Sequence, residues 1–260
     1  MDKKMTYYDD RATLKYSPAN TKLRKLATSA SMSPWLTDGR KVYSIDLLSG
    51  WSCPFADQCL SKVHLTGMGG RYLRDGTLTL FRCFSASQEA VFTSTYALRK
   101  QNFSILRHAK TTSAKVAHLE EALPRKIGVL RIHVSGDFFN QSYFNAILAL
   151  ARNHSNTLFY AYTKSLRYWL TARPQLRTLQ NFVLTASEGG RDDDLIRRHR
   201  LRYSRVVYST YAARKARLPL DFDDSHAADP RRKTQSFSLL IHGTQPRGSR
   251  AQAAVTRITR

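Results

Sequence analysis

The pattern of apolar and polar positions changes character about halfway along the chain. From residue 129 onwards, short apolar runs typical of strands alternate with segments of helical periodicity. The expected strands cover residues 129–138, 157–165, 181–190, 204–210 and 237–244. Strands that alternate with helices predict a parallel sheet, open or closed into a barrel. We therefore expect an α/β fold with parallel βα architecture, built as a modified or incomplete TIM-like (β/α) barrel.

The first half of the chain is less regular. Strands are expected at residues 41–48 and 77–84, with a loop at 66–77 before the second. Ser85 and Gln88 have the spacing of a capping box, which predicts the start of one long helix. We expect residues 1–260 to form a single domain, into which residues 50–84 are inserted as a cysteine-bearing loop region.

The segment "RIHVSGDFF" has polar residues at alternate positions of an expected strand. Strand side chains alternate between two faces, so Arg131, His133, Ser135 and Asp137 would share one face. A strand covered by helices on both sides is normally apolar on both faces. This face therefore either meets solvent or lines a site. Several later strands also end in polar or small residues, and sites in parallel sheets form at the carboxyl ends of strands.

The residues at these strand ends are candidates for catalysis and binding. Asp137 could act as base, nucleophile or metal ligand, or it could cap the following helix together with Asn140. A buried Arg131 needs a carboxylate partner, for which Glu188 is a candidate. The catalytic candidates are Asp137, His133 and Glu188, with His133 in a supporting role. The substrate-binding candidates, each of which could instead have only a surface role, are Ser135, Gly136, Lys164, Ser187, Gly189 and Gly190.

The three cysteines, Cys53, Cys59 and Cys83, have the spacing C-x5-C-x23-C. An odd number of cysteines argues against a framework of disulfides. With His64 as a fourth ligand they could form a zinc site, and alone they could hold an iron–sulfur cluster with an open iron. They could also be small buried hydrophobes.

The charge is strongly positive, with 42 Lys and Arg against 19 Asp and Glu and a net charge of +23. Basic residues are dispersed through the chain, which suits a broad surface for nucleic acid, whether DNA or RNA. We expect no membrane span, because no apolar run reaches eighteen residues. Residues 1–16 lack the apolar middle of a secretory signal, so we expect a soluble, intracellular protein. The sequence contains neither a P-loop nor a dinucleotide-binding fingerprint, so no nucleotide cofactor is evident.

Several motifs carry a resemblance to a known family: "GWSCPFADQCL", "FRCFSASQEA", "RKQNFSIL", "RIHVSGDFFNQSYFNA", "FYAYTKSL" and "HGTQPRGS". With these the chain resembles a phage-encoded family catalogued as gene product 88, whose label carries no activity. Some such phage proteins look like relatives of tRNA-guanine transglycosylases that place 7-deazaguanine bases into DNA.

This second resemblance implies a (β/α) barrel that exchanges guanine in DNA for a 7-deazaguanine base such as preQ0. Asp137 would be the nucleophile or base, and the product would protect phage DNA from restriction in the cytoplasm of an infected bacterial host. The three cysteines would resemble the zinc ligands of the tRNA enzymes, although their spacing departs from the pattern of those enzymes. Many members of the gene product 88 family carry further cysteines near the C-terminus, where this chain has none.

Four functions therefore remain open. The first is a DNA base-modifying transglycosylase, and the second is a redox or radical enzyme with an iron–sulfur cluster on the three cysteines. The third is a nucleic-acid-binding protein without catalysis. The fourth is a metal-dependent nuclease, for which carboxylates at residues 192–194 and 221–224 are available.

Overall fold

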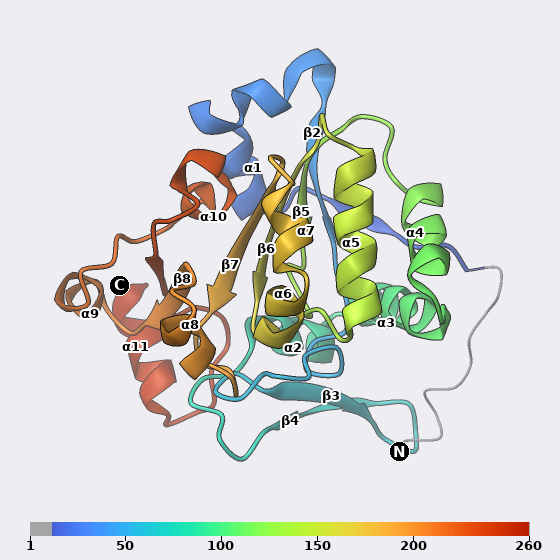
Figure 1. Ribbon diagram of the computed structural model, residues 1–260. Coiled ribbons are helices and arrows are strands. Elements are labelled where there is room, and N and C mark those ends of the chain that lie inside the picture. Colours follow the sequence, from blue (N-terminus) through green and yellow to red (C-terminus); the bar gives the residue numbers. More distant parts are fainter. Residues whose placement is uncertain (1–11, 260) are drawn as a thin grey trace.

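The computed structural model of the chain describes residues 12–259, and its largest element is a seven-stranded sheet (Figure 1). Residues 1–11 lie outside the described part of the chain, and they hold most of the segment in which we expect no secretory signal. The strands, in the order in which they lie side by side, are β1 (Tyr16–Pro18), β2 (Lys41–Ile45), β5 (Ile127–Ile132), β6 (Leu158–Thr163), β7 (Phe182–Ser187), β8 (Tyr203–Val207) and β9 (Phe237–Leu240).

The strands from β2 to β9 are parallel, and only β1 at one edge runs antiparallel to its neighbour. This confirms the expected α/β fold with a parallel sheet. The sheet is not closed, because β1 and β9 form its two edges. A complete barrel is therefore absent from the described residues.

One face of the sheet is covered by the helices that connect its strands (Figure 1). Asn140 caps α5 by accepting from the Tyr143 amide, as its sequence position predicts, and the apolar side of α5 is fully buried. The helices on this face are α3 (Thr93–His108), α4 (Thr112–Glu121), α5 (Gln141–Asn153), α6 (Leu166–Thr171), α7 (Arg173–Arg177) and α8 (Asp194–Arg198), and α9 (Thr210–Lys215) follows β8.

The opposite face carries a second apolar core, formed with short helices from the two ends of the chain. Val129, Tyr160 and Val183 point to this face, whereas Leu130 and Phe159 point to the core under α5. The covering elements are α1 (Thr21–Ala27), η2 (Ala30–Trp35), η3 (Thr37–Gly39), α10 (Ser225–Ala228) and η4 (Pro230–Arg232). None of the helices in the described residues combines the length and apolar character needed to cross a bilayer.

A separate hairpin lies beyond the carboxyl ends of the parallel strands (Figure 1). It consists of β3 (Ser61–Leu65) and β4 (Arg71–Asp75), and it is followed by α2 (Phe84–Val91), while α11 (Arg250–Ile258) lies near the end of the chain. The strand expected at residues 77–84 was wrong: Leu78 and Leu80 are exposed in a turn. The sequence pattern missed the hairpin because its strands are short and largely polar.

The long helix expected from Ser85 is in fact two helices. The first ends at Val91, and the extended backbone of Phe92 (φ −96°, ψ 110°) separates α2 from α3. The expected capping box is also absent, since α2 begins at Phe84 and no side chain caps it.

Candidate functional site

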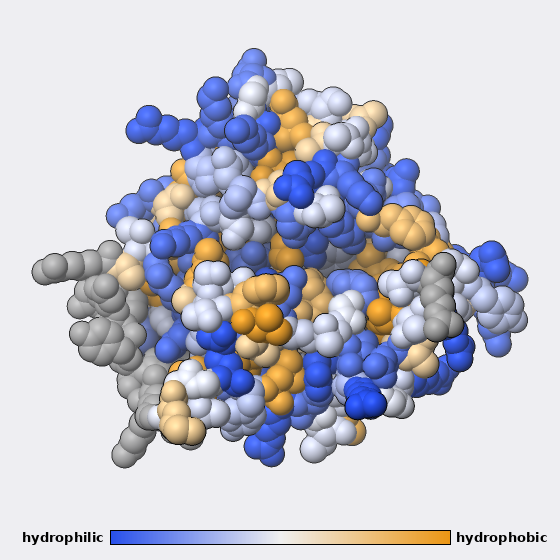
Figure 2. Space-filling model, turned by 180° about the vertical axis from the view of Figure 1, so that it is seen from behind, coloured by the Kyte–Doolittle hydropathy of each residue, from blue (hydrophilic) through white to orange (hydrophobic). Residues whose placement is uncertain are grey.

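A pocket of about 490 Å³ opens at the carboxyl ends of the parallel strands. Its walls come from segments far apart in the sequence: the start of α1, the cysteine-bearing loops, the ends of β5 to β9 and the loop before α10. Pockets of this size accommodate small molecules, and the carboxyl edge of a parallel sheet is where such sites form. Figure 2 shows the face opposite that of Figure 1, where apolar side chains are scattered among hydrophilic ones.

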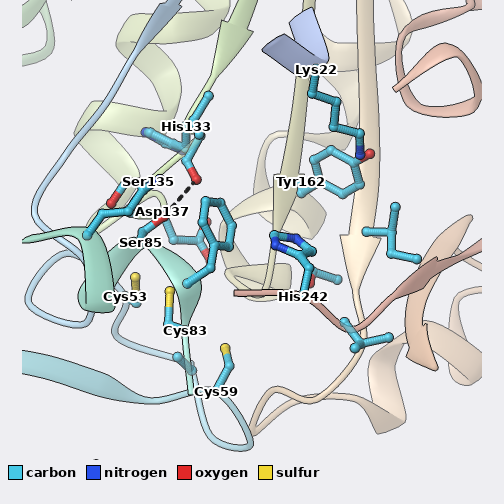
Figure 3. Close-up of a pocket in the computed structure, with 18 of the residues that line it drawn as sticks. Lys22, Cys53, Cys59, Cys83, Ser85, His133, Ser135, Asp137, Tyr162 and His242 are labelled. Carbon is cyan, nitrogen blue, oxygen red and sulfur yellow. Dashed lines mark hydrogen bonds between the residues drawn. The ribbon is translucent and has the colours of Figure 1, made fainter. Parts of the chain in front are cut away.

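All three cysteines line this pocket, although 30 residues separate the first from the last. Cys53 and Cys59 lie in the loop after β2, and Cys83 immediately precedes α2. Figure 3 shows the three side chains gathered at one end of the pocket with their sulfur atoms directed into it. The cysteines are unpaired and half-buried. Burial raises the pKa of Cys83 to about 11 and that of Cys53 well above its usual range.

Hydrogen bonds hold these loops in place. The Ser61 hydroxyl donates to the Cys59 carbonyl (3.5 Å) and accepts from the Cys83 amide (3.3 Å), so one serine joins two of the cysteines. The Gln245 side chain accepts from the amide of Arg82 and donates to its carbonyl, which fixes the residue next to Cys83. The positions of the thiols therefore depend on the folded structure on both sides of the pocket.

His64, the expected fourth zinc ligand, lies apart from this cluster. Its ring stacks on Tyr72 and meets the edge of Trp51, and it does not line the pocket. Within residues 12–259, no three histidine, cysteine, aspartate or glutamate side chains are placed to share one metal ion.

Asp137 lies in the wall of the pocket and is almost completely buried. One of its oxygens accepts from the Thr163 hydroxyl (2.6 Å) and the Phe138 amide (2.7 Å), and the other accepts from the Lys164 amide (2.8 Å). Burial raises its pKa to about 6 against the opposing effect of these hydrogen bonds. Its carboxylate ties the end of β5 to the end of β6. The capping of α5 falls to Asn140.

His133 also lines the pocket, where its backbone leaves the strand with φ 69°. Its Nε2 lies 3.0 Å from the Tyr143 hydroxyl, and its Nδ1 is buried without a hydrogen bond. Burial and the nearby Arg131 lower its pKa to about 3, so the ring is neutral at physiological pH. With these contacts His133 is better suited to support the neighbouring side chains than to act as a catalytic base.

Arg131 pairs with Asp224, and the partner expected from the sequence, Glu188, was wrong. Asp224 lies before α10 and is fully buried, and its Oδ2 is 2.5 Å from Arg131 Nη1. Glu188 instead forms an ion pair with Arg205 and does not line the pocket. The catalytic candidates thus separate, with Asp137 and His133 in the pocket and Glu188 outside it.

Of the substrate-binding candidates, Ser135, Gly136, Lys164 and Ser187 line the pocket, whereas Gly189 and Gly190 do not. The Lys164 ammonium donates to the Ser187 hydroxyl and to the carbonyls of Ser187 and Glu188, so it joins the ends of β6 and β7. The two glycines support the cysteine-bearing loop: the Gly189 carbonyl accepts from the Gln58 amide. A Cβ at residue 190 would lie 3.1 Å from the Phe55 carbonyl.

Several residues of the pocket had no clear signal in the sequence. Lys22, Ser85, Tyr162, Asp224 and His242 all line it. Asp224 belongs to the acidic segment 221–224, whose burial against Arg131 only the fold reveals.

Comparisons with known proteins agree with the resemblance seen in the motifs. No curated protein and no solved structure matches the chain. The family model described as gene product 88 matches residues 12–260, which include the cysteines and every other residue that lines the pocket. The chain therefore belongs to the gene product 88 family.

Proposed function

We propose that the protein is an enzyme that holds an iron–sulfur cluster on Cys53, Cys59 and Cys83 and uses it on a substrate in the adjoining pocket. The observation that carries this proposal is the convergence of the chain's three cysteines on one end of that pocket. Packing alone does not require a thiol at any of these three positions, because a small apolar residue would fill the same space.

A cluster suits this arrangement better than a single zinc ion. A structural zinc ion needs four protein ligands, each at about 2.0–2.3 Å, and His64 is held elsewhere by its aromatic neighbours. A cluster contains several irons, so thiolates that bind different irons lie further apart than the ligands of one ion. Three thiolates also leave one iron open towards the pocket, where it could bind a substrate or cosubstrate.

The strand order gives the proposal an architectural setting. The six parallel strands follow one another in space as they do in sequence, without the reversal of order that marks a doubly wound sheet. This is the order of a (β/α) barrel, so we interpret the fold as an incomplete barrel with its site at the carboxyl edge.

The test is anaerobic purification followed by reconstitution with iron and sulfide. We expect a brown protein with charge-transfer absorption, stoichiometric iron and sulfide, and an electron paramagnetic resonance signal on reduction. Replacement of each cysteine by serine should abolish the signal, whereas Met68→Ser, on the fully exposed turn of the hairpin, should retain it. A colourless protein with stoichiometric zinc bound by the same cysteines would refute the cluster.

Radical chemistry is one use of a cluster with an open iron, and S-adenosylmethionine is its common cosubstrate. Incubation of the reconstituted, reduced protein with S-adenosylmethionine tests it directly. One electron would cleave the carbon–sulfur bond to release methionine, and the deoxyadenosyl radical would end as 5′-deoxyadenosine after taking a hydrogen atom. Release of 5′-deoxyadenosine that depends on all three cysteines would assign the protein to the radical enzymes. Absence of this product would exclude radical chemistry with S-adenosylmethionine, and another redox reaction would then be the use of the cluster.

A DNA transglycosylase is the second candidate, favoured by the position of Asp137 in the same pocket and its raised pKa of about 6. Nucleoside mass spectrometry of DNA from cells that express the protein with a supply of 7-deazaguanine base tests it. A modified deoxyguanosine that disappears with Asp137→Asn would support base exchange. In this second proposal the protein would act in the cytoplasm of an infected bacterial host, where it would modify phage DNA.

A further inference from the structure

Lys22 lies at the end of the pocket opposite the cysteines (Figure 3). There, two cations are arranged around the carboxylate of Asp224. Lys22 Nζ lies 2.6 Å from Asp224 Oδ1, and Arg131 Nη1 lies 2.5 Å from Asp224 Oδ2. The hydroxyls of Tyr160 and Tyr162 donate to the same two oxygens at 2.9 and 3.1 Å. Asp224 is therefore saturated with donors and has no capacity for another.

The two cations, in contrast, retain unused donors. Arg131 donates from Nε to the His133 carbonyl and from Nη1 to Asp224, while its Nη2 makes no hydrogen bond within residues 12–259. About a tenth of the Arg131 side chain (11%) is exposed, and this nitrogen is not one of the fully buried polar atoms without a partner. Lys22 has a third of its side chain exposed and one ionic contact for its three donor hydrogens.

The charge of the pocket wall is also unbalanced. Four cationic residues line the pocket, Lys22, Arg82, Arg131 and Lys164, against the two carboxylates Asp137 and Asp224. Arg82 is paired with Asp75 at 2.6 Å, so the remaining three cations exceed the two carboxylates by one charge. An anion that enters the pocket would compensate this excess. Guanidinium groups with free N–H donors bind the oxygens of phosphates and carboxylates strongly, and an adjacent ammonium adds charge.

We propose that Lys22 and Arg131 form an oxyanion subsite that holds a phosphate or carboxylate group of the substrate. The remainder of the substrate would then extend past Tyr162 and His242 towards the cysteine end, where the reaction takes place. The second statement rests on the proposed cluster enzyme, whereas binding of the anion requires only the folded protein.

Binding measurements on the iron-free protein test the subsite separately from the cluster. The probes are inorganic phosphate, acetate and deoxyguanosine monophosphate, together with a single-stranded oligonucleotide at high salt to suppress nonspecific binding. Lys22→Met removes the ammonium, and Lys22→Gln keeps a donor for Asp224 if the first variant folds poorly. Lys25→Met, an exposed lysine of the same helix that does not line the pocket, is the matched control.

We expect at least one oxyanion probe to bind to the wild type and to Lys25→Met, with a Kd raised tenfold or more in either Lys22 variant. Preference for the monophosphate indicates a free nucleotide, and preference for the oligonucleotide indicates a nucleotide within a strand. Absence of binding by every probe, or equal Kd values in the variants of Lys22 and Lys25, would overturn the subsite. Neither result bears on the proposed iron–sulfur cluster, because the binding measurements use iron-free protein and the cluster is tested separately by reconstitution.

Discussion

The buried carboxylate of Asp224 should make a large contribution to stability, which Asp224→Asn can measure. Burial opposes its ionisation, but Arg131 and Lys22 outweigh burial and lower its pKa from 3.8 to about 2. At roughly 1.4 kcal/mol per pH unit this difference corresponds to about 2 kcal/mol. Removal of one partner from a buried ion pair typically costs about 3–5 kcal/mol. We therefore expect the variant to lose between ~2 and ~5 kcal/mol of unfolding free energy.

Urea denaturation at several pH values is the appropriate assay for this loss. The folded-state pKa lies below the unfolded one, so the contribution is complete above about pH 4 and is lost as the pH falls towards 2. The difference between wild type and variant should shrink over that interval. In a thermal scan near neutral pH, the same loss should lower Tm by roughly 5–10 °C or more.

The control is Asp194→Asn, which removes an exposed carboxylate paired with Arg198 at 2.6 Å. Exposed pairs contribute about 0–1 kcal/mol, so this variant should remain close to the wild type. If Asp224→Asn lost no more stability than Asp194→Asn, the carboxylate would not be the centre of a buried charge network. That result would also overturn the oxyanion subsite, which depends on the same geometry.

Three further predictions concern the loop that follows β5. His133→Asn should flatten the pH dependence of the unfolding free energy between about pH 6.5 and 3. In that range the unfolded chain binds a proton at His133 and the folded protein does not, so the wild type loses up to ~1.4 kcal/mol per pH unit as the pH falls. An unchanged slope would contradict the burial of a neutral imidazole. Gly136→Ala should destabilise by more than ~1 kcal/mol in urea, because its φ is +92° and a Cβ would lie 2.6 Å from Ser52 Oγ. Gly69→Ala has similar φ but open surroundings, so an equal loss there would rule out the clash. Asn140→Ala should cost ~1 kcal/mol through the lost cap of α5, and denaturation within experimental error of wild type would refute that role.

The sequence pattern located the strands of the parallel sheet because their apolar runs are long and the helices between them have a clear period. The same reasoning failed for residues 61–92, where neither condition holds. Strand β4 alternates between partly buried and exposed residues and has Leu73 as its one aliphatic side chain, so its pairing with β3 is visible only in the structure. The break at Phe92 has no proline or glycine to announce it.

For the site, the sequence identified residues but could not assign their partners. Arg131 needed a carboxylate, and the choice of Glu188 assumed that the nearest acidic strand end would supply it. The fold brings Asp224 over the sheet from a loop 93 residues away instead, and contacts at such separation leave no trace in local periodicity. Lys22 and His242 were missed for the same reason, since each enters the pocket from an end of the chain.

The cysteine-bearing segment links the fold of this protein to its pocket. Its loops are fixed from two directions: the Gln58 amide donates to the Gly189 carbonyl after β7, and Gln245 holds Arg82 beside Cys83. Such anchoring brings three thiols to a pocket whose other end carries excess positive charge. A site that served only to staple a loop would need neither the cavity nor the cations. The combination instead suits chemistry in which a bound anionic substrate is held at one end and transformed at the other.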